Sequence, residues 1–121
     1  MANEITLKAS LKFEKDSTNE TLDAGTVQIT VSGSQMLKHR QSVGTSEEAI
    51  TLGDISAGGY VMAINRDSTN FVKIRSGTGA TDLIRLKAGE VALFRLDTGA
   101  TAPFAIADTA ACEVEFFLIE A

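Results

Sequence analysis

The sequence predicts an all-β protein, a single-domain antiparallel β-sandwich that is jelly-roll-like. In several short runs apolar and polar residues alternate with a period of two, which suits a strand with one buried face and does not suit a helix. Turn-forming residues interrupt these runs about every eight to twelve residues, a spacing typical of sandwiches. Of the 121 residues, 44% are hydrophobic and 22% are charged, which is enough apolar material for one core. We therefore expect residues 1–121 to form one domain without a linker.

The N-terminal third predicts two strands and a weaker third one. Every second residue from Ile5 to Phe13 is apolar, which predicts a half-buried strand. The polar residues 16–19 then break the run, because their short side chains bond to nearby backbone in turns. Alternation resumes over residues 27–31 and predicts a second strand. Residues 36–45 mix polar and β-branched residues, so we expect an exposed or edge strand there.

The middle of the chain predicts two hairpins. Residues 60–64 and 71–75 are strand-like runs separated by six polar residues, and we expect them to pair with each other. Residues 82–86 and 91–96 flank a Lys-Ala-Gly-Glu turn, and we expect them to form the second hairpin.

Three further strands are predicted around and after these hairpins. Residues 50–52 run directly into Gly53, which leaves room for about one helical turn and favours a short strand. Residues 104–107 follow Pro103 in a loop, and residues 112–120 form the strongest strand pattern of the chain.

The two faces of the last strand both become apolar toward its end. Cys112 starts the face that also carries Phe116 and Leu118, while Phe117 and Ile119 project on the opposite side. A strand that buries the first face in its own domain exposes the second unless another layer covers it. Contact with another copy and a doubly covered central strand are both compatible with this pattern. We favour the contact and take Phe117 and Ile119 as oligomer-interface candidates.

The residues offer no catalytic, cofactor or metal site. The only histidine, His39, lies between Lys38 and Arg40, and no serine or cysteine nucleophile pairs with it in a recognisable pattern. One histidine and the single Cys112 are too few ligands for a zinc or iron site. Residues 77–79 lack the rest of a phosphate-binding glycine motif. We predict that the chain is not an enzyme and that Cys112 is a buried apolar residue.

Charge and hydropathy point away from nucleic acids and membranes. The net charge of −5 provides no broad basic surface for a phosphate backbone. No stretch approaches the roughly 18 apolar residues of a membrane span, and the first residues lack a signal-peptide pattern. We expect the protein to be made and kept in a cytoplasm. The chain has no tryptophan and one tyrosine, which weakens a sugar-binding interpretation.

From about residue 46 onward, the sequence resembles a family of small virion proteins of tailed bacteriophages. The stretches that carry the resemblance are residues 60–74, 86–96 and 110–120. The resemblance implies a jelly roll or related β-sandwich, encoded among phage structural genes and acting as a capsid decoration (cement) protein or a tail or fibre component. The N-terminal third, including the basic Lys38, His39 and Arg40, lies outside the resemblance.

The resemblance and the residue patterns lead to one functional expectation. We expect a homo-oligomer, with a trimer favoured, that sits on the capsid surface of a virion and bridges major capsid protein subunits after synthesis in the host bacterial cytoplasm. Lys38, His39 and Arg40 are the capsid-contact candidates. The alternative is a tail, baseplate or head-fibre component, including a receptor- or glycan-binding module.

Overall fold

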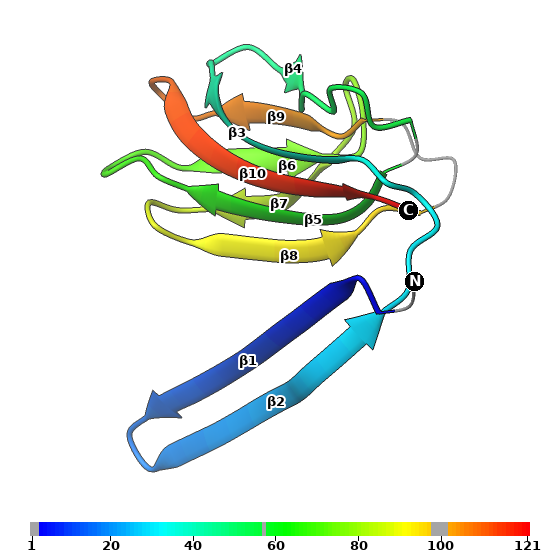
Figure 1. Cartoon of the computed structure of the whole chain (residues 1–121). Helices are drawn as coiled ribbons and strands as arrows, with labels where there is room; N and C mark the ends of the chain where they lie inside the picture. The colour runs from blue at the N-terminus through cyan, green and yellow to red at the C-terminus, as the bar shows by residue number, and fades with distance from the viewer. Residues whose placement is uncertain (1–2, 57, 98–101) are drawn as a thin grey trace. The chain divides into compact units, whose positions relative to one another are not determined.

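The computed structural model describes residues 3–56, 58–97 and 102–121, and these contain ten strands and no helix (Figure 1). The chain divides into two compact units, residues 1–32 and residues 33–121. The first unit contains β1 (Ile5–Lys15) and β2 (Thr18–Ile29). The second contains β3 (Met36–Val43), β4 (Glu48–Ala49), β5 (Gly58–Asn65), β6 (Val72–Arg75), β7 (Asp82–Leu86), β8 (Val91–Arg95), β9 (Phe104–Ala107) and β10 (Cys112–Glu120).

The second unit is a sandwich of two four-stranded antiparallel sheets. Their strand orders are β3-β10-β5-β8 and β4-β9-β6-β7, the arrangement of a jelly roll of eight strands in two sheets. The predicted all-β sandwich is thereby confirmed. The strands of the sandwich all lie within residues 33–121, whereas the predicted domain spans residues 1–121.

The core of the sandwich lies between the two sheets, and β10 contributes its longest apolar face. Cys112, Val114, Phe116 and Leu118 are buried, as their alternation predicts. β10 lies between β3 and β5 in its sheet, and these residues share one core cluster with buried residues of the opposite sheet, such as Val72 and Ala105. Burial raises the pKa of the Cys112 thiol, and the nearby carboxylates of Asp67 and Asp108 add to the increase.

The two predicted hairpins are wrong, although their strands are present. β5 belongs to one sheet and β6 to the other, and the same is true of β8 and β7. Each polar loop therefore crosses from sheet to sheet. Among the eight strands of the sandwich, only β6 and β7 follow each other in the chain and also lie side by side in a sheet. Alternation fixes which face of a strand is buried, but it does not say which strand lies alongside.

The buried Asn65 explains how two of these crossings are held. Its amide Nδ2 donates to the carbonyl oxygens of Asn70 and Leu86, each at 3.0 Å. Its backbone N–H donates to the Glu90 carbonyl at 3.0 Å, and its own carbonyl accepts from Gly89 N–H at 2.8 Å. Asn65 thus joins the β5–β6 crossing to the β7–β8 crossing, and its polar atoms are paired as buried groups require.

The short strand near residue 50 is displaced from its predicted position. β4 comprises Glu48–Ala49 and pairs with β9, so residues 50–52 lie outside it. Ile50 is instead a core residue whose N–H donates to the Pro103 carbonyl at 2.8 Å. The predicted edge strand at residues 36–45 is confirmed as β3, which lies at one edge of its sheet.

The first unit is a two-stranded hairpin that is more exposed than its sequence predicts. β1 and β2 pair throughout their length, with Lys15 opposite Thr18, so the turn is Asp16-Ser17 rather than the four residues expected. Asp16 has a φ of 54°. A half-buried first strand is wrong, since Leu11 is 76% exposed and Phe13 is 55% exposed.

Candidate functional site

The candidate site is the outer face of the β3-β10-β5-β8 sheet, the face opposite the core. The pairing register places side chains from all four strands in rows across this face. One row is Lys38, Phe117, Met62 and Leu93, and the adjacent row is Arg40, Glu115, Ile64 and Val91. At the end where β3 begins, Met36 lies opposite Ile119.

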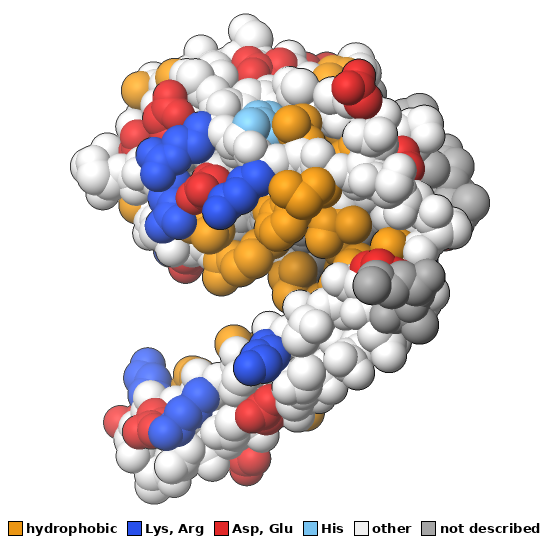
Figure 2. All heavy atoms as spheres, viewed as in Figure 1, with side chains coloured by type: hydrophobic (Ala, Val, Ile, Leu, Met, Phe, Trp, Pro, Cys, Tyr) orange, Lys and Arg blue, Asp and Glu red, His pale blue; other side chains and the backbone are white. Residues whose placement is uncertain are grey.

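Large apolar side chains remain exposed on this face. The exposed members are Met36, Met62, Val91, Leu93 and Phe117, and we call them the outer patch. Figure 2 shows hydrophobic side chains gathered on this side of the sandwich next to a group of lysine and arginine side chains. Ile64 and Ile119 are half-buried on the same face. A collection of exposed apolar side chains on one sheet is typical of surfaces that make contact with other proteins.

A basic margin borders the outer patch. Lys38 and Arg40 project from the edge strand β3, and Arg66 follows β5. Arg66 holds the carboxylate of Glu115 with Nε at 2.9 Å and its terminal nitrogen at 2.8 Å. The hydrogen bond from Arg66 lowers the pKa of Glu115 against the effect of desolvation, and the charges of Arg40 and Lys38 lower it further. Glu115 is therefore an ionised partner inside a mainly basic margin.

A shallow hollow lies where the apolar and basic groups meet. It has a volume of about 170 Å³ and is lined by Lys38, Met62, Ile64, Arg66, Glu115 and Phe117. Its lining combines apolar side chains with both signs of charge, which resembles part of a protein contact more than a ligand cavity of several hundred Å³.

The structure brings together four of the five residues predicted as contacts. Phe117 and Ile119 lie on the outer face with Lys38 and Arg40. His39 projects toward the other side of β3, where its ring lies 5.7 Å from the ring of Phe116 and its Nε2 lies 3.1 Å from the Thr51 carbonyl oxygen. Because neighbouring side chains of a strand project to opposite sides, Lys38 and Arg40 lie on the outer face and His39 lies on the inner one.

Sequence reasoning missed most of the outer patch. Met62, Val91 and Leu93 come from β5 and β8, and their connection to Phe117 depends on the order of strands in the sheet. The available signal was the even spacing of apolar residues on both faces of β5, where Met62 and Ile64 alternate with the core residues Val61 and Ala63.

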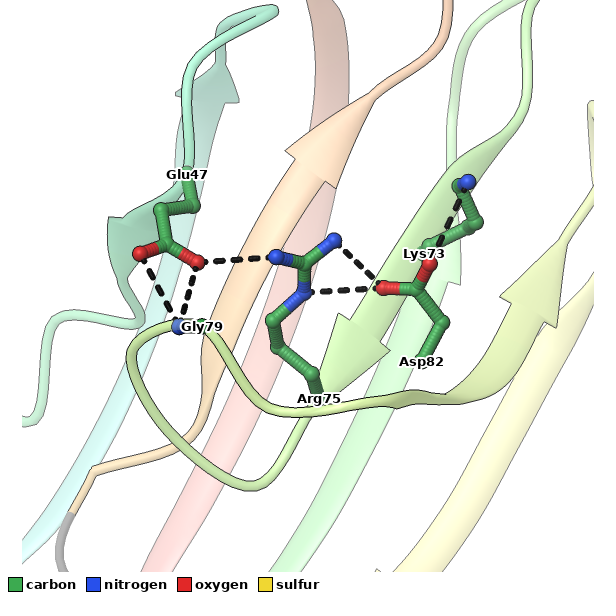
Figure 3. A network of polar contacts seen from close by, with 5 residues as sticks. All are labelled: Glu47, Lys73, Arg75, Gly79 and Asp82. Atoms are coloured by element: carbon green, nitrogen blue, oxygen red, sulfur yellow. Dashed lines mark hydrogen bonds and ion pairs between the residues drawn. The ribbon is translucent and has the colours of Figure 1, made fainter.

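A second polar cluster joins β6 and β7 to the segment before β4 (Figure 3). Arg75 donates to Asp82 at 2.8 Å and to Glu47 at 2.9 Å, and Glu47 also accepts from the N–H of Gly79. Lys73 reaches the other oxygen of Asp82 at 3.2 Å. Its carboxylates are held by cations or backbone N–H groups, so the cluster ties a turn to the sheet edge.

Tyr60 and Asp67 make contacts of their own within the sandwich. The guanidinium of Arg95 lies 5.5 Å from the centre of the Tyr60 ring. The Asp67 carboxylate accepts from the N–H groups of Asn70 and Thr69 within its own loop, at 2.6 and 3.0 Å, and these bonds lower the pKa of Asp67. Neither residue lines the hollow on the outer face.

Within residues 3–56, 58–97 and 102–121, no three or more His, Cys, Asp or Glu side chains gather in a way that could hold a metal ion. The same residues include no helix of the length and hydropathy needed to cross a membrane. No family model, curated protein or solved structure matches the chain.

Proposed function

We propose that this chain is a structural subunit that works by packing its outer sheet face against other protein subunits. On the basis of the family resemblance, we further propose that it is a head decoration protein of a tailed bacteriophage that bridges major capsid protein subunits. Both statements concern packing and need no chemical step.

The observation that supports packing is the outer patch with its basic margin. Protein interfaces combine an apolar centre, depleted of charge, with a polar and charged rim. On the outer face, Met62 and Phe117 lie at the centre of such an arrangement, with Lys38 and Arg40 along the edge strand. The jelly roll is compatible with the proposal because capsid domains use it, but lectin domains use it too, so the fold alone decides nothing.

A decoration protein needs only modest affinity for each contact. Many copies on a lattice gain stability through multivalency, because each additional contact is made at a high effective concentration. A closed ring of copies, with a trimer favoured, would bury apolar sheet faces and leave the rest of each sandwich available for the capsid surface.

Cryo-electron microscopy of the virions of the phage that encodes this chain tests the proposal. We expect density for the sandwich on the outside of the head, repeated with the symmetry of the capsid lattice and touching more than one capsid subunit. Density restricted to the tail, baseplate or a fibre would overturn the decoration role and support the alternative. A chain missing from purified virions would refute a virion role of either kind.

A further inference from the structure

The β1–β2 hairpin has one mainly apolar face. Register pairs Leu7 with Val27 and Leu11 with Leu22, and the two residues of each pair project to the same side. The apolar residues on this side, which we call the hairpin face, are Ile5, Leu7, Ala9, Leu11, Phe13, Leu22, Val27 and Ile29. Toward the turn the same side also carries Glu20, opposite Phe13, and the Lys15–Thr18 pair. The opposite side is polar and includes Lys12 opposite Thr21.

This hairpin needs a cover for its apolar face. A two-stranded hairpin on its own is at best marginally stable in water, and a third strand or a packed apolar face is required to stabilise it. Leu11 and Leu22 face each other across the strands but are 76% and 77% exposed. Their burial against another apolar surface would supply the missing stabilisation.

The outer patch of the sandwich complements the hairpin in charge as well as in hydropathy. Residues 3–32 carry a net charge of −2, because five acidic side chains outnumber three basic ones. The acidic ones are Glu4, Glu14, Asp16, Glu20 and Asp23, and the basic ones are Lys8, Lys12 and Lys15. The outer sheet face has a charge of +2, from Lys38, Arg40, Arg66 and Arg95 against Glu113 and Glu115. Opposite net charges steer two surfaces together and disfavour like pairs.

The connection between the two units is short. The N–H of Val31 donates to Glu4 in the first unit at 3.0 Å, and the N–H of Gly33 donates to the Ala121 carbonyl in the second unit at 2.9 Å. Only Ser32 lies between them, so their Cα atoms are at most about 7.6 Å apart. The outer patch of a second copy can meet the hairpin face whatever the geometry of this connection.

We propose that the hairpin face of one copy docks on the outer patch of a second copy, so that copies are linked head to tail by their N-terminal hairpins. Such a contact uses two different surfaces of the chain and closes into a ring when the rotation between copies permits it. The inference deepens the proposed packing function and rests on it, since it names a second copy as the partner of the outer face.

The first test removes the apolar groups from either side of the contact. Paired substitutions Leu11→Ser and Leu22→Ser should weaken self-association by roughly a hundredfold, as loss of two buried leucines predicts. Met62→Ser with Phe117→Ser should weaken it to a similar degree. The matched control is Thr6→Ser with Gln28→Ser, an opposite pair on the polar side of the same hairpin that carries no charge, and it should leave association unchanged. Sedimentation equilibrium measures the association, and circular dichroism with thermal melting checks that the sandwich remains folded.

The second test asks which copy provides the cover. Full-length chains with Phe13→Cys are mixed with full-length chains with Met62→Cys and treated with a short bismaleimide. We expect cross-linked dimers in the mixture and few in either variant alone. The native protein, whose Cys112 is buried, provides the blank.

Three results would overturn the docking proposal. A chain carrying both cysteines that cross-links only within itself would place the hairpin on its own sandwich. Cross-linking of the Phe13→Cys variant with itself in preference to the mixture would indicate contact between hairpins. A native protein that stays monomeric at micromolar concentration, without cross-links in the mixture, would exclude the contact.

The two proposals can fail separately. Head-lattice density in virions without cross-linking between copies would remove the docking contact and leave the decoration role. Cross-linking between copies together with density confined to the tail would support the docking contact and overturn the decoration role.

Discussion

The β1–β2 hairpin and the β3-β10-β5-β8 sheet are built from the same alternation of apolar and polar residues, but they bury their apolar side chains to different extents. β10 buries Phe116 completely, because a second sheet lies across its inner face. β1 leaves Phe13 more than half exposed, because its sheet has two strands and no layer of its own unit against it. The comparison shows that alternation predicts a strand with an apolar side. Whether this side is buried depends on a second layer formed by other segments.

The largest effect on stability is expected for the buried face of β10. Phe116→Ala should lower the free energy of unfolding of the sandwich by about 3–5 kcal/mol, because it removes a fully buried aromatic side chain and leaves a cavity. Phe117→Ala, one residue away on the outer face, is the matched control and should change it by less than about 1 kcal/mol. Urea denaturation followed by circular dichroism measures both. Equal effects of the two substitutions would contradict the assignment of faces.

The next effect concerns the crossings between the sheets. Asn65→Ala should destabilise the sandwich by about 2–4 kcal/mol, because it leaves the carbonyls of Leu86 and Asn70 without the amide that pairs with them. Asn19→Ala, at an exposed position in the hairpin, should have little effect on the same urea transition. A tolerated Asn65→Ala would mean that water replaces the amide and that the crossings do not depend on it.

A smaller effect should be confined to the hairpin. Gly25 has a φ of 68° at an irregularity in the β1–β2 pairing, and its N–H donates to Asp23 Oδ1 at 2.7 Å. Gly25→Ala should cost the hairpin about 1 kcal/mol, since a Cβ disfavours this backbone conformation. Gly44→Ala is the control, because its φ is not positive and its nearest Cβ neighbour is 3.7 Å away. Amide hydrogen exchange should then increase in β1 and β2 and not in β10.

The smallest effect is on the pH dependence of the sandwich. Burial alone would raise the pKa of Asp82, but hydrogen bonds and charge interactions with Arg75 and Lys73 outweigh it and lower the pKa. The unfolded chain regains the ordinary value of about 4. This stabilisation is therefore fully present above pH 4 and is lost as the pH falls through the lowered pKa of the folded protein.

Comparison of urea midpoints at pH 7 and pH 3 measures this contribution. Asp82→Asn should slightly reduce the difference in urea midpoint between pH 7 and pH 3. The effect is small because the side chains of the cluster are partly exposed and solvent screens their charges. Asp54→Asn, at an exposed position before β5, provides the control. An Asp82→Asn variant with the full native pH dependence would show that the cluster in Figure 3 contributes nothing measurable.

The amino-acid sequence by itself determined the all-β class, most of the strands and the inward face of β10. These properties depend on the order of residues along one strand, since neighbouring side chains project to opposite sides. The sequence also marked Phe117 and Ile119 as apolar residues on the opposite face. It gave no sign of the boundary near Ser32, because strand-like segments lie on both sides of it and no linker-like stretch separates them.

Only the tertiary structure decided which strands became neighbours. The loops 65–70 and 87–90 have turn residues typical of hairpins, yet they connect β5 to β6 and β7 to β8 across the sandwich. This arrangement buries both apolar faces at once, and it is enforced by contacts far apart in sequence, such as that of Asn65 with Leu86. The outer patch arises in the same way, because Phe117 meets Met62 and Leu93 only after the sheet has assembled. A pattern with a period of two specifies a face, and packing between distant segments specifies what lies beside it.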